Sequence, residues 1–379
     1  MSAEHIYQVI YEHLLEEIRE GKYGIGMQLP TEKELCRKYS VSRITAKHAL
    51  DMLAANGVVE RAKGKGTFVI EPKAKPSDSA FTKVRGKLIA VILPDFADAF
   101  GVKLLQGIEK ECAANGVNFV LRLSYGSFSA EQQVLEEMEE LGVDGIMISP
   151  VSEVCYNPKL LNMILNHFPL VIIDRVMLGM DVCFVGTDNI TSVKNAMNYL
   201  FELGHEQIAW ISPKVAPSCP LEYRQNGFLE SCIDHNIVPR RELWYNEILS
   251  VRPQQNTPEN IQRDIDRLAE HLTAYPEITA VFASEYNVAW LVKRAAQSIG
   301  LNIPQDLSII CFDLPDSFSQ FREFTHVQQD EDGIGRKGVQ LLLQHIADDT
   351  LPNSSVTFPG LFSIGRSTAK VRADRIPAK

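Results

Sequence analysis

Short apolar runs alternate with longer amphipathic segments over most of the chain, and this alternation limits the fold more than any other feature. The first run, Leu88–Leu93, contains only Leu, Ile, Ala and Val, as expected of a strand that is buried on both faces of a sheet. The segment that follows it repeats its apolar residues at helical spacing. Strands that alternate with helices form an open parallel α/β sheet with helices on both faces.

The alternation continues almost to the end of the chain. Strands are predicted over residues 88–93, 118–123, 145–148, 170–173, 207–211, 244–248, 280–282, 307–311 and 355–358. Helices are predicted over residues 99–115, 130–141, 158–167, 190–203, 221–235, 258–274, 288–299 and 333–347. Two successive units of this kind predict two lobes, with a ligand crevice at the carboxyl ends of their strands.

Residues 28–69 have a different pattern, which predicts a helix, a turn, a second helix and a two-stranded wing. Thr31 and Glu34 have the spacing of a capping box that begins the first helix, and Ser42 suits the N-cap of the second. Asn56-Gly57 is predicted to end the second helix, because both residues tolerate the left-handed conformation. The predicted inward face of the second helix consists of Ile44, Ala49, Leu50 and Leu53.

The wing is predicted to have strands at 58–60 and 67–69, joined by a basic tip over 62–66. Residues 30–69 hold eight Lys or Arg against four acidic residues. Arg43 and Lys47 share one face of the second helix, and Thr45 lies between them near the helix start, where base edges are read. A solvated basic face on an ordinary helical domain is the alternative. The helix, turn, helix and basic wing in this order favour DNA binding.

The formal net charge of −10 is unevenly distributed along the chain. Residues 1–87 hold 15 basic and 11 acidic side chains, whereas residues 88–379 hold 23 basic and 37 acidic ones. Because the local field decides where phosphate binds, the N-terminal part is suited to DNA and the acidic remainder is not.

The N-terminal part resembles the winged-helix domain of the GntR family of bacterial transcription regulators. The matching pieces are Leu29-Pro30-Thr31-Glu32-Lys33-Glu34-Leu35, Val41-Ser42-Arg43, Ala49-Leu50 and Gly64-Lys65-Gly66-Thr67-Phe68-Val69. The resemblance implies that Arg43, Thr45 and Lys47 face the major groove, that Lys33 approaches the DNA from the first helix of the pair, and that the wing reaches the minor groove. The DNA-binding residues expected on this basis are Lys33, Ser42, Arg43, Thr45, Lys47, Lys63, Gly64 and Lys65.

The later part of the chain resembles the sugar-responsive core of LacI-family regulators, which has the fold of periplasmic binding proteins. The matching pieces include Val171-Ile172-Ile173-Asp174-Arg175, Val185-Gly186-Thr187-Asp188-Asn189, Arg224-Gln225-Asn226-Gly227-Phe228, residues 303–310, Asp313 and Val327-Gln328-Gln329. A GntR head on a LacI-like core is the architecture of the arabinose-repressor subfamily. The expected domains are a winged helix over 1–71, a linker over 72–86, a two-lobed core over 87–368 and a tail over 369–379.

Sugar binding needs carboxylates and amides at strand ends, arginine donors and an aromatic floor. The effector-binding residues expected from the resemblance are Asp95, Phe100, Asp174, Arg224, Glu285, Asp313 and Gln329. For each residue alone, a salt bridge in a hinge or loop is the alternative, and Arg175 is a candidate partner for Asp174. One position departs from the family, which usually has Asn-Asp where this chain has Glu285-Tyr286. Since an ionised Glu only accepts hydrogen bonds, the crevice is expected to bind a different hydroxyl pattern or a ligand with a positive group.

Other classes of protein fit the sequence poorly. It contains no GxxxxGK[ST], HExxH or GxSxG motif, and its seven cysteines form no CxxC pair, so neither catalysis, nor a cofactor, nor a metal site is expected. No apolar run of 18 residues or signal peptide is present, which indicates a soluble, cytoplasmic protein. We therefore expect a homodimeric repressor that a sugar releases from a palindromic operator. Corepression, or a core that serves only for dimerisation, is the alternative.

Overall fold

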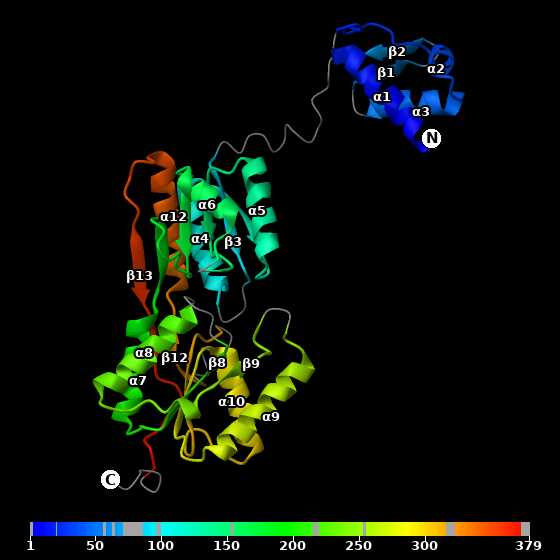
Figure 1. Ribbon diagram of the computed structural model, residues 1–379. Helices are drawn as coiled ribbons and strands as arrows, with labels where there is room; N and C mark the ends of the chain where they lie inside the picture. Colours follow the sequence, from blue (N-terminus) through cyan, green and yellow to red (C-terminus); the bar gives the residue numbers. More distant parts are fainter. Residues whose placement is uncertain are drawn as a thin grey trace. The chain divides into compact units, whose positions relative to one another are not determined.

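The structure is a computed structural model of the 379-residue chain. It describes residues 3–19, 21–55, 58–62, 65–70, 86–95, 100–152, 155–214, 220–252, 255–315 and 323–372. The chain divides into two compact units, Met1–Arg85 and Gly86–Lys379, which are called the head and the core below (Figure 1). The predicted linker over 72–86 lies outside the described residues except for Gly86.

The head contains three helices and a two-stranded antiparallel wing. Its elements are α1 (Ala3–Arg19), α2 (Glu32–Tyr39), α3 (Arg43–Ala55), β1 (Val59–Ala62) and β2 (Gly66–Val69). The predicted capping box is confirmed, because Thr31 Oγ1 accepts a hydrogen bond from the Glu34 amide and the Glu34 carboxylate accepts one from the Thr31 amide. The Ser42 hydroxyl likewise caps α3 by accepting from the Thr45 amide at 3.2 Å. The predicted C-cap at 56–57 lies outside the described residues.

One predicted core residue of the head is wrong. Ile44 was expected to face inward, but its side chain is 81% exposed. The buried side of α3 is instead formed by Ala46, Ala49, Leu50 and Leu53, at positions i, i+3, i+4 and i+7. Ile44 precedes this stripe by two residues, which places it about 200° away around the helix. It therefore lies on the exposed surface of α3.

The first lobe of the core is a six-stranded parallel sheet in the order β13-β7-β6-β5-β3-β4. Its strands are β3 (Leu88–Leu93), β4 (Asn118–Leu123), β5 (Gly145–Ile148), β6 (Leu170–Ile173), β7 (Cys183–Asp188) and β13 (Ser355–Pro359). Helices α4 (Val102–Asn115) and α12 (Glu331–Ala347) pack on one face, and α5 (Phe128–Leu141) and α6 (Pro158–Leu165) pack on the other. The strands buried on both faces match the continuous apolar runs in the sequence.

The second lobe repeats this plan in the order β9-β8-β10-β11-β12-β14, with β14 antiparallel. Its strands are β8 (Ile208–Pro213), β9 (Tyr245–Ile248), β10 (Ala280–Ala283), β11 (Ser308–Phe312), β12 (Thr325–Gln328) and β14 (Leu361–Ser363). Helices α7 (Asn189–Glu202) and α8 (Pro220–Asp234) cover one face, and α9 (Pro258–Ala274) and α10 (Tyr286–Ser298) cover the other. The predicted two-lobed α/β fold is therefore confirmed.

The lobes are not built from two successive stretches of chain. The chain crosses between them after β7, after β12 and after β13, so that α12 and β13 return to the first lobe (Figure 1). Three strands of the core, β7, β12 and β14, are not predicted from the sequence. These strands are short or contain polar residues and glycine, which hides them from a search for apolar runs. Among the described residues, no helix is long and apolar enough to cross a membrane.

Helices α4 and α12 approach closely because glycines lie at their contact. A Cβ added at Gly335 would lie 2.5 Å from the Leu104 carbonyl oxygen and 2.9 Å from the Ile108 amide, both of them backbone atoms that cannot rotate away. We expect Gly335→Ala to force the helices apart at a cost of about 1–3 kcal/mol and to lower the melting temperature by several degrees. Gly24→Ala is the control, because its added carbon would meet only Met27 Sδ at 3.8 Å. Equal melting temperatures for the two variants would contradict the close contact.

Candidate functional site

The exposed surface of α3 carries the residues expected to contact DNA. Arg43 has an 84% exposed side chain, and its Nε donates to Glu32 Oε2 at 2.9 Å. Lys33 and Lys47 are exposed. A groove in the head between α2, α3 and the wing is lined by Glu32, Lys33, Arg43 and Arg61, among others. The surface is therefore basic and open, as contact with phosphate requires.

Glu32 joins α2, α3 and the wing in one ion-pair network. Its carboxylate accepts from Arg43 and, at 2.5 Å, from Nη2 of Arg61 in β1. Arg61 also pairs with Asp51 of α3. Hydrogen bonds from Arg43 and then from Arg61 lower the pKa of Glu32, so the carboxylate stays ionised and holds both guanidinium groups. Sequence reasoning assigned no role to Glu32 or Arg61, because the wing meets α2 only in the tertiary structure.

The other expected DNA-binding residues differ in how accessible they are. The hydroxyls of Ser42 and Thr45 hydrogen bond to each other at 2.8 Å, so Ser42 acts at least as a cap. Lys65 is exposed at the start of β2. Lys63 and Gly64 lie outside the described residues.

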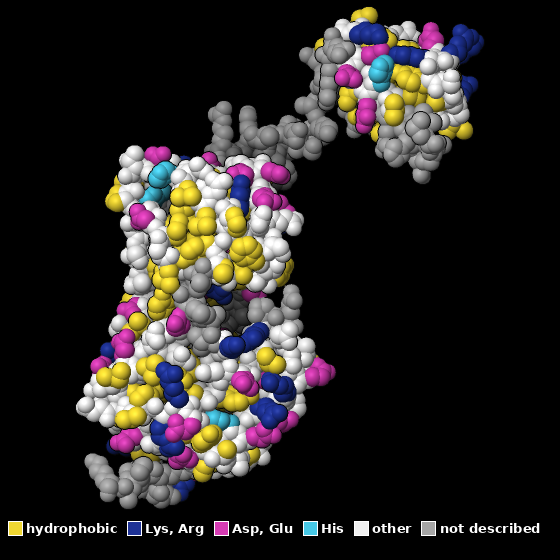
Figure 2. All heavy atoms as spheres, viewed as in Figure 1, with side chains coloured by type: hydrophobic (Ala, Val, Ile, Leu, Met, Phe, Trp, Pro, Cys, Tyr) yellow, Lys and Arg dark blue, Asp and Glu magenta, His cyan; other side chains and the backbone are white. Residues whose placement is uncertain are grey.

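In the core, the carboxyl ends of the strands of both lobes meet at a crevice, and Figure 2 shows a hollow where the lobes join. Asp174 follows β6 of the first lobe, and Asp313 follows β11 of the second. The two residues hold equivalent places, because both have a left-handed φ (65° and 57°) and both donate their amide to the neighbouring strand, at Val185 and Val327. Non-glycine residues in this conformation are uncommon and concentrate at functional sites.

Arg224 of α8 is 6% exposed and is held from three sides. Its Nε donates to Asn189 Oδ1 at 2.9 Å, and its Nη1 donates to the Ser284 carbonyl at 2.9 Å. The guanidinium carbon lies 3.7 Å from the centroid of the Phe312 ring. This buried, fixed cation at the strand ends is suited to binding hydroxyls or a carboxylate.

Gln329 connects the two lobes. Its Nε2 donates to Asp313 Oδ2 at 2.8 Å, and its Oε1 accepts from the hydroxyl of Thr187 at 2.7 Å. Thr187 lies in β7 of the first lobe, whereas Asp313 belongs to the second. The side-chain amide of Gln329 therefore already joins the lobes at a chain crossing. The expected contact of Gln329 with the effector would have to use the hydrogen-bonding capacity that remains.

The carboxylates of the crevice influence one another. Burial raises the pKa of Asp313 to about 6, although Arg224 and Gln329 oppose the shift, and Asp174 of the other lobe contributes to it. Burial also raises the pKa of Glu285 to about 7, which Arg224 opposes and Asp313 increases. The pKa of Asp174 is raised by burial as well. Asp174, Arg224, Glu285 and Asp313 therefore lie within electrostatic range of one another, and their role in effector binding stays a prediction.

Two further expected residues lie in the segment between β3 and α4. Asp95 is exposed at the end of β3, and Phe100 is half-buried before α4. Arg175 does not hydrogen bond to Asp174; its Nη1 donates to the carbonyl oxygens of Pro150 and Val151. The charge of Arg175 nonetheless opposes the rise in the pKa of Asp174, so the two side chains interact through charge and not through a hydrogen bond.

Glu331 was missed by sequence reasoning. It begins α12 and is 2% exposed, and its Oε2 accepts from the Gly101 amide at 2.6 Å. An acidic residue in a first helical turn normally stabilises its own helix, so nothing in the sequence indicated that it binds the start of α4. Burial raises its pKa to about 7, and Asp313 adds to the shift.

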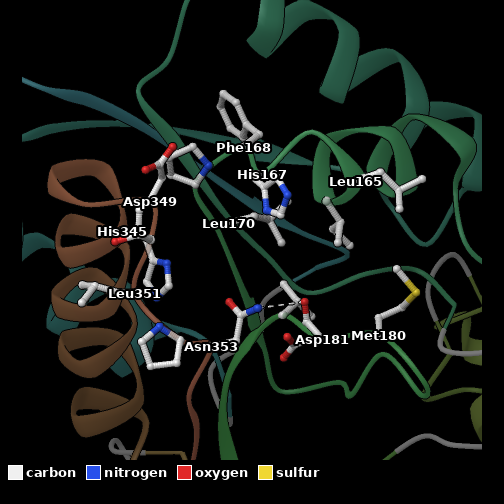
Figure 3. Close-up of a pocket in the computed structure, with 15 residues that line it drawn as sticks. Leu165, His167, Phe168, Leu170, Met180, Asp181, His345, Asp349, Leu351 and Asn353 are labelled. Atoms are coloured by element: carbon white, nitrogen blue, oxygen red, sulfur yellow. Dashed lines mark hydrogen bonds between the residues drawn. The ribbon is translucent and has the colours of Figure 1, made fainter.

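A second groove lies in the first lobe at the amino ends of β6, β7 and β13 (Figure 3). This end of the sheet is opposite the carboxyl ends of the strands, where the crevice lies. His345 and Asn353 line it, and the Asn353 amide donates to the Asp181 carbonyl at 2.9 Å. Beneath it, Cys183 Sγ lies 3.1 Å from His345 Nε2, and burial raises the pKa of this thiol. Over the described parts of the chain, no group of three His, Cys, Asp or Glu residues could hold a metal ion.

Comparison with known proteins agrees with this two-part organisation. Residues 6–69 match the family described as bacterial regulatory proteins, gntR family, and residues 197–368 match the periplasmic binding protein-like domain. The arabinose metabolism transcriptional repressor of Halalkalibacterium halodurans is 22% identical over 98% of this chain and 99% of its own length.

Two solved structures share the fold of the core. A LacI family transcriptional regulator from Enterococcus faecium with bound ribose is 26% identical, with a TM-score of 0.61 over 76% of this chain and all of its own. The complex of the transcriptional regulator CelR with cellobiose is 19% identical, with a TM-score of 0.64 over 86% of this chain and 91% of its own.

The fold and the comparisons together define a bacterial transcription regulator of two parts. The chain joins a gntR-family helix-turn-helix domain to a periplasmic-binding-protein-like domain.

Glu331 gives a testable pH dependence. Its pKa is about 7 in the folded chain and near 4.5 when exposed, so between these values the folded state binds a proton that the unfolded state releases. Stability should therefore fall as the pH rises from 5 to 7.5. Glu331→Gln keeps an acceptor for the Gly101 amide without the charge, and we expect it to raise stability at pH 7.5 by roughly 1 kcal/mol or more and at pH 5 by little. Thermal melts of both proteins at both pH values measure this; an equal change at both pH values would contradict it.

Proposed function

We propose that this chain is a DNA-binding transcriptional repressor whose affinity for its operator is controlled by a small carbohydrate bound in the crevice of the core. The observation that carries the proposal is the joining of a winged helix with an exposed basic recognition helix to a two-lobed core whose strand ends gather Asp174, Arg224 and Asp313. The arabinose repressor and the ribose-bound and cellobiose-bound regulators with the same core fold support this function.

The chemistry of the crevice suits a polyhydroxylated ligand. Carboxylates accept hydrogen bonds from sugar hydroxyls, and the guanidinium of Arg224 donates to them. Phe312, which packs against Arg224, fixes the orientation of this donor. Glu285 and Gln329 complete the proposed effector site, with Phe100 and Asp95 at its border.

Effector binding would act on DNA through the arrangement of two heads. Three chain crossings join the lobes, so a ligand held by Asp174 of one lobe and Asp313 of the other would favour one angle between them. In a homodimer, this angle would set the spacing of the two heads on a palindromic operator. The effector changes the equilibrium only if it binds the state that does not bind DNA more tightly, by about 1.4 kcal/mol for each tenfold shift. Such a protein acts where the DNA is, in the bacterial cytoplasm.

In the head, we propose that Arg43 and Lys47 contact DNA from α3, together with Lys33, Ser42, Thr45 and the wing residues Lys63, Gly64 and Lys65. Glu32 holds the Arg43 guanidinium in place before DNA arrives. The exposed Ile44 lies on the same surface, where an apolar side chain suits contact with a thymine methyl group.

Replacement of Arg43 tests the DNA-binding assignment. We expect Arg43→Ala to weaken binding to an operator selected from random DNA by roughly 5- to 150-fold, since a good arginine–base contact contributes about 1–3 kcal/mol. Fluorescence anisotropy at fixed salt measures the affinity. Arg267→Ala removes an exposed arginine of α9 and serves as the charge-matched control. Unchanged operator affinity for Arg43→Ala would show that another surface reads the DNA.

Replacement of Arg224 tests the crevice. Arg224→Lys keeps a buried cation but loses the planar group that binds Asn189 and Ser284 and packs on Phe312. We expect this variant to keep operator binding and to bind the sugar that stabilises the wild type at least tenfold more weakly. Thermal-shift titration and operator release measure the two effects. Operator release at the wild-type sugar concentration would place the effector elsewhere, and a wild type that responds to no sugar would favour a core that only dimerises.

A further inference from the structure

We propose that the effector of this chain carries a positively charged amine, and that Glu285 binds this amine in the crevice. The inference rests on the proposed role of the crevice as the effector site. It adds a chemical class of ligand, an amine-bearing sugar or polyol, which neither the fold nor the relatives that match the core specify.

The charged side chains around Arg224 include more carboxylates than guanidinium groups. Asp174 and Asp313 are two carboxylates, one from each lobe, and Arg175 and Arg224 are two guanidinium groups near them. These four charges balance. Glu285 adds a fifth charge within electrostatic range of Arg224 and Asp313, and it leaves this group of five with one excess negative charge.

Both guanidinium groups of this group make hydrogen bonds, although the buried Nε of Arg175 has no partner among the described residues. Arg224 donates to Asn189 and to the Ser284 carbonyl, and its face lies against Phe312. Arg175 donates to the carbonyl oxygens of two residues of the loop after β5. These hydrogen bonds go to acceptors other than Glu285, whereas the charge of Arg224 acts on the Glu285 carboxylate through space.

Glu285 differs from its acidic neighbour in its local partners. Asp313 accepts from the side chain and the backbone amide of Gln329. Glu285 is the N-cap residue of α10, yet its side chain does not cap the helix, and no described residue donates a hydrogen bond to it. Beside it, Ser284 is fully buried, and its hydroxyl has no partner among the described residues. The partly exposed Glu285 carboxylate at the end of β10 is thus left for a ligand.

An ammonium group meets this environment better than a hydroxyl. It has three donors and a positive charge, and attraction to a carboxylate is stronger in a partly buried site than in water. A neutral sugar would cover Glu285 but would bring no positive charge. The covered carboxylate would then have to take up a proton. An amine instead favours the ionised form, so the protons exchanged on binding distinguish the two ligands.

Calorimetry with matched pairs of sugars tests the inference on the full-length protein at pH 7. The probes are D-glucosamine and D-glucose, D-galactosamine and D-galactose, and 1-amino-1-deoxy-D-fructose and D-fructose. We expect at least one amine to bind tenfold or more tightly than its neutral partner, and to release protons when the titration is repeated in buffers of different ionisation enthalpy. Glu285→Gln should remove both the preference and the proton release. Glu206→Gln, at an exposed glutamate before β8, is the matched control and should change neither.

The possible failures are distinguishable. If neutral sugars bind as tightly as their amine partners, or if Glu285→Gln keeps the preference, the inference is wrong and the carbohydrate-responsive function stands. If none of the six probes binds the wild type, the inference is wrong, and the same titration with arabinose, ribose and cellobiose decides separately whether the carbohydrate-responsive function stands. A melting temperature of Glu285→Gln close to that of the wild type will show that the variant is folded.

Discussion

The core depends on the three chain crossings between its lobes, and the side chain of Gln329 adds a hydrogen-bonded link at one of them. Its amide joins Thr187 of the first lobe to Asp313 of the second, at distances of 2.7 and 2.8 Å. Asp313 in turn lies within the field of Arg224 and of Asp174 from the opposite lobe. The connection between lobes and the proposed ligand site therefore share residues. In the proposed mechanism, a ligand that binds these carboxylates would act directly on residues that link the two lobes.

The same region holds more buried acid than stability alone favours. Asp313, Glu285 and Glu331 all have pKa values raised to about 6 or 7, because burial disfavours their charged forms. Because of these raised pKa values, the folded chain is less stable at neutral pH than at a more acidic pH. Sites that bind polar ligands commonly keep this kind of strain, since groups left unsatisfied in the free protein become partners of the ligand.

In the head, ionic contacts organise the surface rather than the interior. Glu32 connects α2 to Arg43 of α3 and to Arg61 of the wing, so one carboxylate fixes the three elements that surround the proposed DNA-binding groove. Exposed ion pairs contribute little to stability, and the value of this network lies in the orientation of Arg43. The hydrophobic interior beneath it, with Leu35, Leu50 and Leu53, holds the helices together independently.

The sequence by itself determined the local structure and the class of the protein. Continuous apolar runs gave β3, β5 and β6 with their correct bounds, because strands buried on both faces cannot carry polar residues. The capping box at Thr31 gave the start of α2, since its hydrogen bonds span only three residues. The resemblance to LacI-family regulators led us to expect Asp174, Arg224 and Asp313 in one site, and their charges act on one another in the structure. The tertiary structure decided what depends on distant contacts. It returned α12 and β13 to the first lobe, placed Glu331 at the start of α4, turned Ile44 outward, and committed the amide of Gln329 to a connection between lobes. Local spacing contains no information about which of two similar sheets a late strand will join, because that choice is made by packing between segments more than a hundred residues apart.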